Sequence, residues 1–486
     1  MRDLVVLVPG ITGSVLRKDD KDVWAISGAS LSGFLKSAGR ALEALRLPLD
    51  YDPRKPPNDG VQATEVFRDF HGILGLGKID GYTALDSMIR ETFEVVAGTD
   101  DPDVPANYFA FPYDWRLSNR LTGERLREFV EPRLHTWRKR ASPDAKVILL
   151  AHSMGGLVAR HYLECLDGWR DCRALVTFGT PFRGSVAAVD YLANGYKQLF
   201  VDLTAVLRSM PSVYELLPIY PALKVEGKYA RVHEADGLPH IDRARAAAGR
   251  RFHEAIEAAV ERHREDVAYL RDGYVIYPVV GTRQPTLQSA TFDGRAITVS
   301  GDVYPDVVDR ALRGGDGTVP RASATPIELS KAYRETFFVE RHGSLQNNVY
   351  VLNDLAERLR QLQAEGTEHI RGTWESRGAR ARPTISVRVD DAYVRGEEPV
   401  RVDATLDGAD AATALRARIQ RIDAPASIET VPMVEAGGVW SVHGDHLPEG
   451  TYRITVESDL LGDVGPTPVT DVFEILGPRQ TVGGRD

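Results

Sequence analysis

The segment KVILLAHSMGGLVARHYLECL, residues 146–166, constrains the fold of this chain more than any other. Its first part, 146–150, is a continuous apolar run, which is typical of a strand buried on both faces. Its last part, 155–166, has apolar residues at helical spacing, so Ser153 is predicted on a tight turn from strand to helix. This is the context of a nucleophile elbow, where small neighbours of the serine avoid the adjacent backbone. Ala151 replaces the first glycine of the usual G-x-S-x-G pattern, and the alternative is an ordinary turn with a capping serine.

The predicted elements around this turn alternate between strands and helices, which indicates an α/β fold with a mostly parallel sheet over residues 1–365. Between about 182 and 270 the pattern becomes mainly helical, and we expect a cap inserted into the sheet domain. Strands are predicted at 4–9, from 107, and at 146–150, 174–181, 274–282 and 335–340, and helices at 84–93, 121–140, 155–166 and 347–363.

The pattern changes after residue 365. Residues 366–382 are polar and rich in glycine and arginine, which predicts a linker. Beyond them, over 383–478, apolar residues alternate with period two and are separated by Gly, Pro, Asp and Asn signals. Such a pattern predicts a small, all-β, immunoglobulin-like antiparallel sandwich. Its strands are predicted at 385–390, 400–407, 414–422, 439–444, 451–458 and 469–476.

Composition narrows the class of protein. The chain has 486 residues, a formal net charge of −9 and no long basic run, which argues against a nucleic-acid partner. Its two cysteines, Cys165 and Cys172, are predicted to be buried thiols rather than a bridge. The start, MRDLVVLVPG, lacks a leader pattern, and no transmembrane span is seen, so a cytoplasmic location is expected. No metal or cofactor is expected, because HExxH, a Cys/His cluster and a phosphate loop are all absent from the sequence.

A serine hydroxyl becomes a good nucleophile only when a base, usually a histidine oriented by a carboxylate, removes its proton. In elbow proteins the acid and then the histidine follow the serine in the chain. Asp316 in RGGDGTVP and His342 in VERHGSLQNN follow predicted strands and fit this order. The alternatives are an Asp-Gly turn for the first and a loop histidine for the second. The competing candidates are the acids Asp302 and Asp306 and two histidines expected to be exposed on cap helices, His253 and His263.

The tetrahedral intermediate of such chemistry needs two backbone N–H donors, an oxyanion hole. One is expected from Met154, directly after the serine, and the other from Ile11 in the loop VPGITGS, which follows the first strand. The alternative for this Pro-Gly loop is a plain strand-ending turn. His152 precedes the serine and is expected to point away from it, because adjacent elbow residues diverge.

Several segments occur together and in order along the first 360 residues. They resemble the lecithin:cholesterol acyltransferase family, which includes lysosomal phospholipid deacylases and bacterial relatives. The combination is specific, above all YDWR together with the elbow. The segments are VVLVPGITGSVL (5–16), FPYDWRL (111–117), AHSMGG (151–156), FGTPFRGS (178–185), GGDGTVP (314–320) and His342.

The resemblance implies an α/β-hydrolase fold with a cap and a mobile lid, here about residues 20–80, over a lipid-binding groove. It implies Ser153, Asp316 and His342 as a catalytic triad and Ile11 and Met154 as the oxyanion donors. Trp24 is similar in position to the family's tryptophan near the acyl site, although it could simply pack the lid. Asp114 and Arg116 of YDWR are expected to form a structural ion pair. Unlike the animal members, this chain has no cysteine pair closing the early lid region.

These features favour a serine hydrolase of the lipase or phospholipase type, acting on lipid esters through an acyl-enzyme. One alternative is an acyltransferase that passes the acyl group to an alcohol. Another is a non-catalytic binding or assembly protein that works through the sandwich, which could also bind a partner protein. A further alternative is an effector directed at the cell's own membrane. Residues 28–45 are amphipathic, with Lys36 and Arg40 on the polar side, and would suit transient contact with a membrane surface.

Overall fold

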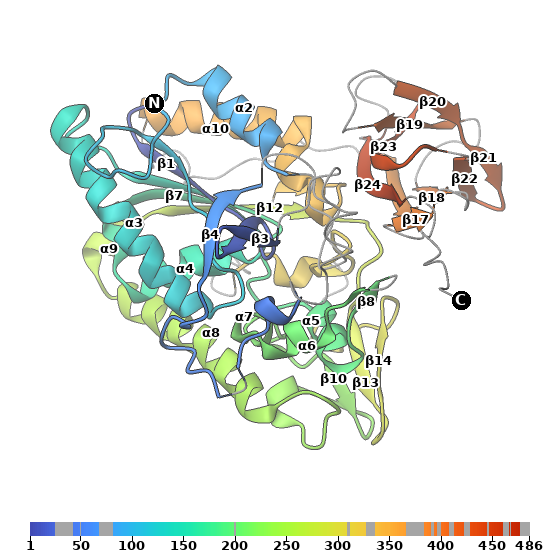
Figure 1. The fold of residues 1–486 in the computed structure, drawn as a ribbon. Helices are drawn as coiled ribbons and strands as arrows, with labels where there is room; N and C mark the ends of the chain where they lie inside the picture. The colour runs from blue at the N-terminus through green and yellow to red at the C-terminus, as the bar shows by residue number, and fades with distance from the viewer. Residues whose placement is uncertain are drawn as a thin grey trace, which may run out of the picture.

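The fold is taken from a computed structural model, in which an α/β part is followed by a group of strands near the C-terminus (Figure 1). The structure describes residues 1–24, 42–48, 50–67, 81–198, 201–308, 312–326, 336–365, 383–389, 393–395, 400–407, 413–421, 428–444, 447–459, 466 and 468–476. The predicted linker at 366–382 and most of the amphipathic stretch at 28–45 lie outside these residues.

Six parallel strands form the central sheet, in the order β15-β12-β7-β6-β1-β5. Every residue of β1 and β6 is buried, and Val6 lies opposite Leu149 in their register. Continuous apolar runs suit these strands because helices cover both faces of the sheet. The predicted mostly parallel sheet is confirmed. Its strands are β1 (Leu4–Val8), β5 (Tyr108–Ala110), β6 (Val147–His152), β7 (Cys172–Phe178), β12 (Val275–Gly281) and β15 (Thr336–Phe338).

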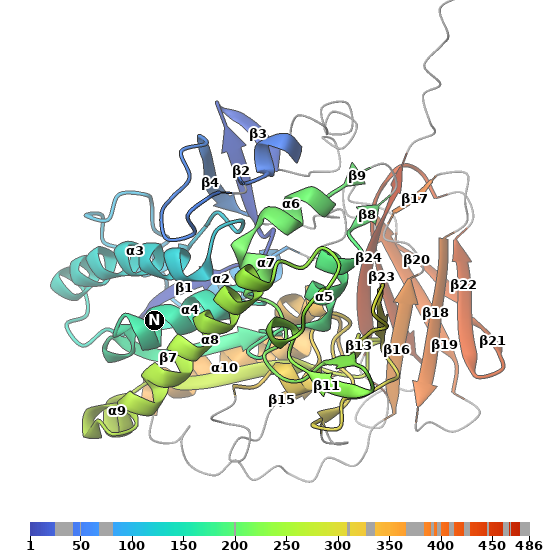
Figure 2. The ribbon, with the colours of Figure 1, turned by 90° about the horizontal axis from the view of Figure 1, so that it is seen from below.

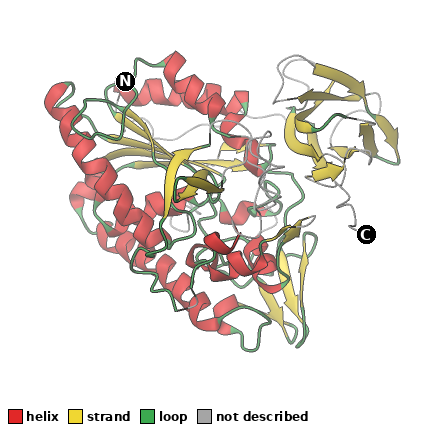
Figure 3. Ribbon diagram, viewed as in Figure 1, coloured by secondary structure: helices red, strands yellow, loops and turns green. Residues whose placement is uncertain are grey.

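Helices cover the sheet on both sides (Figures 1 and 3). The pair α2 (Thr83–Thr92) and α10 (Val349–Glu365) lies on one face, and α3 (Asn119–Arg140) and α4 (Gly155–Cys165) lie on the other. Pro132 lies inside α3, and Ser118 caps its start by accepting the Arg120 N–H. None of the helices in the described ranges combines the length and the apolar character needed to cross a bilayer.

The region between β7 and β12 holds the expected helices together with strands that the sequence did not predict. Residues 197–230 contain several strands of two or three residues, too short to show a period. Two of them join two later strands in a small sheet, in the order β11-β10-β13-β14. The helices are α5 (Val186–Ala193), α6 (Thr204–Ser209), α7 (Pro211–Tyr214), α8 (Arg243–His263) and α9 (Val267–Asp272), and the strands are β8 (Lys197–Gln198), β9 (Val201–Asp202), β10 (Leu223–Val225), β11 (Lys228–Ala230), β13 (Ser289–Phe292) and β14 (Ile297–Ser300).

A second small sheet follows β1 in the chain. It contains β2 (Ser14–Lys18), β3 (Lys21–Trp24) and β4 (Val61–Val66), with β2 in the middle. Asp19 and Asp20 both have positive φ, at 50° and 59°, and form the two-residue turn between β2 and β3. β3 and β4 lie within the region where the lid is expected, of which residues 25–41, 49 and 68–80 lie outside the described part.

Residues 384–476 form two sheets that pack face to face (Figure 2). Side chains from both sheets share one apolar core, for example Val387 of the first sheet and Ile454 of the second. We call this unit the C-terminal sandwich. It agrees with the predicted period-two pattern, although β17 pairs in parallel with β24 and β17, β20 and β21 were not predicted. The first sheet contains β16 (Thr384–Val389), β18 (Val400–Asp407), β22 (Val439–Gly444) and β21 (Val434–Ala436), and the second contains β17 (Tyr393–Arg395), β24 (Val469–Leu476), β23 (Gly450–Ser458), β19 (Leu415–Arg421) and β20 (Ile428–Pro432).

Candidate active site

The turn from β6 to α4 holds Ser153 in a left-handed backbone conformation, with φ of 50°. For a non-glycine residue this costs about 1–3 kcal/mol, a strain that is concentrated at functional sites. The Ser153 N–H donates to Phe178 O at 2.8 Å, which fixes the turn against the end of β7. A Cβ on Gly155 would lie 2.4 Å from Pro9 O, so glycine is required two residues after the serine. Ala151, at the position of the usual first glycine, is fully buried in β6.

Ser153, His342 and Asp316 form a continuous hydrogen-bonded group, which we call the candidate triad. His342 Nε2 lies 2.8 Å from Ser153 Oγ, and His342 Nδ1 lies 2.8 Å from Asp316 Oδ2. The other carboxylate oxygen, Oδ1, accepts N–H groups from Thr318 at 2.9 Å and Val319 at 2.7 Å. Because an ionised carboxylate only accepts, Nδ1 carries the ring proton and Nε2 is free to take the serine proton. The arrangement can therefore activate the hydroxyl.

The parallel sheet explains why residues so distant in sequence meet. Ser153, Asp316 and His342 follow β6, β12 and β15, and the carboxyl ends of parallel strands share one edge of the sheet. Gly179, just after β7, lies between the acid and the base. It has φ of 58°, and a Cβ there would lie 2.8 Å from Asp316 Oδ2 and 2.9 Å from His342 Nδ1. Glycine at this position leaves the space in which the imidazole and the carboxylate meet.

The competing residues lie elsewhere. Asp302 and Asp306 are exposed. The expectation that His253 and His263 are exposed is wrong, because His263 is half-buried and His253 is buried where α8 packs against α4 and α7. Burial lowers the pKa of His253 to about 4. Among the described residues, no group of three or more His, Cys, Asp and Glu side chains is placed to hold a metal ion.

The loop after β1 packs directly against the elbow. A Cβ on Gly10 would lie 2.9 Å from Ser153 Cβ, so the backbone that carries Ile11 approaches the serine closely. Ile11 and Met154 are both buried. Within the described part of the chain, the backbone N–H of neither residue has a hydrogen-bond acceptor. An oxyanion hole requires two such N–H donors close to the nucleophile.

A buried network behind the elbow links the loop after β1, the elbow and the base. His152 Nε2 lies 3.1 Å from His342 O, which can only accept, so Nε2 carries the proton. Its Nδ1 must then accept from Tyr82 Oη, 3.0 Å away, and Tyr82 Oη in turn accepts the Gly10 N–H at 2.9 Å. Burial lowers the pKa of His152 to about 3, so the ring stays neutral. His152 is expected to point away from the serine, and its ring bonds to Tyr82 Oη and His342 O, so it supports the candidate base from behind the elbow.

The FPYDWR segment wraps the same loop. Tyr113 Oη donates to Pro9 O at 2.9 Å, and Trp115 Nε1 donates to Ser14 O at 3.2 Å. Both aromatic side chains are buried. The two bonds hold the beginning and the end of the PGITGS turn, which places Ile11 between fixed points. The co-occurrence of these two motifs in the sequence thus has a direct structural reason.

Trp24 is fully buried and lies beside this loop. Its Nε1 donates to Thr12 O at 3.2 Å, and its ring meets Trp115 edge to face with centroids 5.1 Å apart. Thr12 has φ of 63°, a conformation that needs such support. These contacts hold Trp24 against the loop after β1, and its role beside an acyl chain or in packing the lid stays a prediction.

Asp114 and Arg116 form the predicted ion pair. Arg116 Nε lies 2.9 Å from Asp114 Oδ1, and its NH2 lies 2.7 Å from Asp114 Oδ2, a two-point contact. The remaining Arg116 nitrogen donates to Asp59 Oδ2 at 2.9 Å and to Ala44 O at 3.2 Å. The guanidinium is fully buried. It therefore ties together two stretches, around residues 44 and 59, that belong to the expected lid region.

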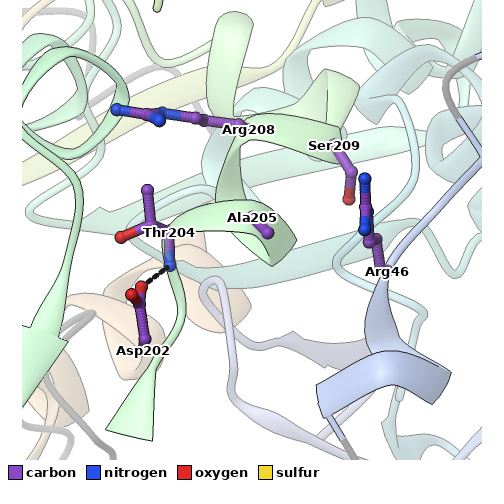
Figure 4. Close-up of a pocket in the computed structure, with 6 residues that line it drawn as sticks. All are labelled: Arg46, Asp202, Thr204, Ala205, Arg208 and Ser209. Atoms are coloured by element: carbon purple, nitrogen blue, oxygen red, sulfur yellow. Dashed lines mark hydrogen bonds between the residues drawn. The ribbon is translucent and has the colours of Figure 1, made fainter.

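A cavity of about 580 Å³ lies between α6 and the segment around residue 46 (Figure 4). Two of its charged groups already have partners: Asp202 accepts the Thr204 N–H at 2.9 Å, and Arg208 donates to Leu192 O at 2.8 Å. The candidate triad does not line it, and it is therefore not assigned as the substrate site. The lining residues are Arg46, Asp202, Thr204, Ala205, Arg208 and Ser209.

A six-stranded parallel sheet, a serine at positive φ after a middle strand, and an acid and a histidine after later strands define an α/β-hydrolase fold. The family model described as lecithin:cholesterol acyltransferase matches residues 55–238. Over these residues, the match confirms the resemblance to this family that the motifs carry. The matched range includes FPYDWRL, AHSMGG and FGTPFRGS, whereas PGITGS, GGDGTVP and His342 lie outside it.

One curated relative is lecithin-cholesterol acyltransferase-like 4 of Arabidopsis thaliana, 29% identical over 245 residues, which are 44% of this chain and 42% of the relative. The match thus spans less than half of that protein. Among solved structures, the mature lipase BlEst2 of Bacillus licheniformis is 14% identical and covers 74% of this chain and 91% of its own, with a TM-score of 0.29. Phospholipase PlaB of Legionella pneumophila is 10% identical and covers 94% and 85%, with a TM-score of 0.21. These TM-scores are too low for the likenesses to support the fold or the function.

Proposed function

We propose that this protein is a serine hydrolase that cleaves lipid esters through an acyl-enzyme. The observation that carries the proposal is the hydrogen-bonded chain from Ser153 Oγ through the His342 ring to Asp316 Oδ2. The family of residues 55–238 supports an ester with a lipid acyl group as the substrate. Transient contact with a membrane surface is part of the proposal, because lipid esters are presented at such surfaces.

The proposed reaction uses the hydrogen bonds of the candidate triad. His342 Nε2 takes the proton of Ser153 as Oγ attacks the carbonyl carbon of the ester. The negative charge that develops on the carbonyl oxygen is stabilised by the N–H groups of Ile11 and Met154. The intermediate collapses, the alcohol leaves with the proton from His342, and the acyl group stays on Ser153. A water molecule, deprotonated by His342, then attacks the acyl-enzyme and releases the fatty acid and the free serine.

A second candidate is transfer of the same acyl group to an alcohol. The chemistry is identical up to the acyl-enzyme, after which the alcohol replaces water as the second nucleophile. This candidate is favoured because the matching family and the Arabidopsis relative are both named after acyl transfer. Which nucleophile reaches the acyl group decides between the two reactions.

Product analysis on vesicles of mixed phospholipids and neutral esters, with and without an alcohol acceptor, tests both candidates. Wild type is expected to release fatty acid or to form a new ester, and Ser153→Ala is expected to do neither. Matched pairs test the other two roles. Asp316→Asn and His342→Gln should lose activity by about 10³- to 10⁴-fold, the cost typical of triad residues, while Asp306→Asn and His263→Gln keep it.

Labelling with a fluorophosphonate separates an enzyme from a non-catalytic binding protein. The expected result is labelling of wild type at Ser153 and none in Ser153→Ala. A wild-type protein that is folded, unlabelled and inert on all these esters and on short-chain esters would overturn the proposed function.

A further inference from the structure

The C-terminal sandwich contacts the loop that carries Asp316 through Gln284. The Gln284 N–H donates to Gly315 O at 2.9 Å, so its backbone adjoins the residue before the acid. Its side chain turns to the sandwich, where Oε1 accepts the Val387 N–H at 3.2 Å and Nε2 donates to Ile385 O at 3.4 Å. Gln284 is only 3% exposed. One buried side chain therefore connects the acid loop to β16.

The sandwich contacts the base through the two residues that precede His342. Arg341 Nε lies 3.2 Å from Asp471 Oδ2, and Arg341 NH1 donates to Val387 O. Glu340 Oε1 accepts the Arg341 N–H at 2.8 Å and the Thr470 N–H at 3.2 Å. Glu340 and Asp471 are 1% and 2% exposed. The backbone just before His342 is thus held by β24 and by β16.

These contacts also provide hydrogen-bond partners for backbone groups on an edge of the sandwich that has no neighbouring strand. β16 is the edge strand of its sheet, so one side of its backbone has no neighbouring strand. Gln284 and Arg341 bond to that free side at Ile385 and Val387. A buried polar group that loses its hydrogen-bond partner destabilises the fold. The interface therefore favours the one arrangement of β16 and the two loops in which these groups are paired. The same bonds that cover the edge fix the two loops.

We propose that the C-terminal sandwich positions two residues of the candidate triad. It holds Asp316 through Gln284, and it holds His342 through Glu340 and Arg341. The inference rests on the proposed function, in which these two residues act as acid and base. It assigns a task to a unit that lies outside the matched family range of 55–238. The residues act through the triad and do not touch the substrate. A displacement of the imidazole by a fraction of an ångström slows proton transfer without changing how the acyl chain binds.

The test compares the full-length variants Arg341→Gln and Asp471→Asn with wild type. We expect kcat for ester hydrolysis and the rate of fluorophosphonate labelling to fall by about 10- to 100-fold, with KM within about twofold of wild type. The double variant should be no slower than the worse single variant, because both substitutions remove the same ion pair. Arg341→Lys, which keeps the charge, should recover part of the loss. The control is Arg401→Gln, which removes an exposed ion pair with Asp403 on the sandwich.

Hydrogen exchange of the peptide 339–348 provides a readout that does not depend on activity. The His342 N–H donates to Asp316 O at 2.8 Å, and Asp471→Asn should speed its exchange while leaving β6 protected. Unchanged kcat, labelling and exchange in well-folded variants would overturn the inference while the proposed function stands. An inert wild-type protein would overturn the function, and exchange would still decide whether the sandwich fixes the base loop.

Discussion

The side chain of His152 bonds to the backbone of His342, with Nε2 3.1 Å from the carbonyl oxygen and the two rings 5.1 Å apart between centroids. The residue before the nucleophile thus holds the main chain of the candidate base. Tyr82 completes the link, because its hydroxyl joins the His152 ring to Gly10 beside the predicted oxyanion donor. The buried side chains of His152 and Tyr82 therefore link the elbow, the candidate base and the loop after β1.

Tyr82→Phe should slow catalysis without weakening substrate binding. The substitution keeps the ring but leaves the Gly10 N–H and His152 Nδ1 without their shared partner, so the loop and the elbow are less firmly placed. We expect kcat to fall by about 10-fold or more, with KM little changed. Steady-state kinetics checks this, with Tyr350→Phe as the control because Tyr350 is exposed on α10. Equal kcat values for the two variants would remove the positioning role of Tyr82.

Gly10→Ala should disable the site while the fold persists. The added Cβ would lie 2.9 Å from Ser153 Cβ and 3.0 Å from His152 Nδ1, and the loop must retreat to relieve the contact. Retreat moves the Ile11 N–H away from the developing oxyanion, and loss of one such donor costs about 10²- to 10³-fold in kcat. The comparison is Gly301→Ala, whose Cβ would meet Thr286 O at 3.2 Å. Circular dichroism and kcat measured together separate loss of function from unfolding, and near-normal kcat in Gly10→Ala would contradict the placement of Ile11.

Glu215→Gln should change how stability depends on pH. Burial raises the pKa of Glu215 to about 7 from 4.5, although Ser118 and Asn119 donate to its carboxylate. Between these two values the folded state binds more protons than the unfolded state, so the free energy of unfolding falls as pH rises. The glutamine variant has no such titration. The difference in free energy of unfolding, variant minus wild type, should therefore increase from about pH 4.5 to 7.

Denaturant titrations at several pH values measure this difference. Other groups that titrate in the same window, such as Glu340, whose pKa burial raises to about 8, contribute equally to both proteins and cancel. Glu261→Gln, on the exposed side of α8, is the control and should follow wild type at every pH. A constant difference across the window would show that Glu215 is not perturbed in the folded protein.

Arg116→Met should be among the most destabilising single changes. It leaves the buried carboxylate of Asp114 without its two-point partner and frees Asp59 and Ala44 O. Removal of one member of a buried pair typically costs about 3–5 kcal/mol. Thermal and chemical unfolding measure the loss. Arg54→Met removes an exposed ion pair with Asp52 and should cost less than about 1 kcal/mol. Equal losses in the two variants would show that the buried Arg116 ion pair stabilises the fold no more than an exposed pair does.

The sequence predicts the sheet well where burial leaves a clear signal. Strands such as β1 and β6 are short, continuous apolar runs because helices cover the sheet on both sides, and such a run is typical of a fully buried strand. The turn at Ser153 is also clear, because the strand before it and the glycines and the helix after it all predict a turn at that position. The positions of Asp316 and His342 follow from chain order and from the strands that precede them.

Other features depend on contacts that no local pattern records. Tyr82 reaches the site from a position 70 residues before His152, and no motif surrounds it. His253 has a polar neighbourhood in sequence, yet α8 turns it toward α7. Strands of two or three residues, such as β10 and β11, are too short for a period and exist because they pair with each other and with β13. Tertiary packing decided each of these cases.

The order of synthesis gives the contacts of the C-terminal sandwich a consequence in time. A ribosome makes Ser153, Asp316 and His342 well before it makes β24, whose Thr470 and Asp471 reach back to the base loop. A growing chain can thus carry all three residues of the candidate triad while the base loop still lacks its support. If the sandwich positions that loop, the proposed hydrolysis reaches its full rate only after β24 has been made and folded, and nearby lipids are spared until then.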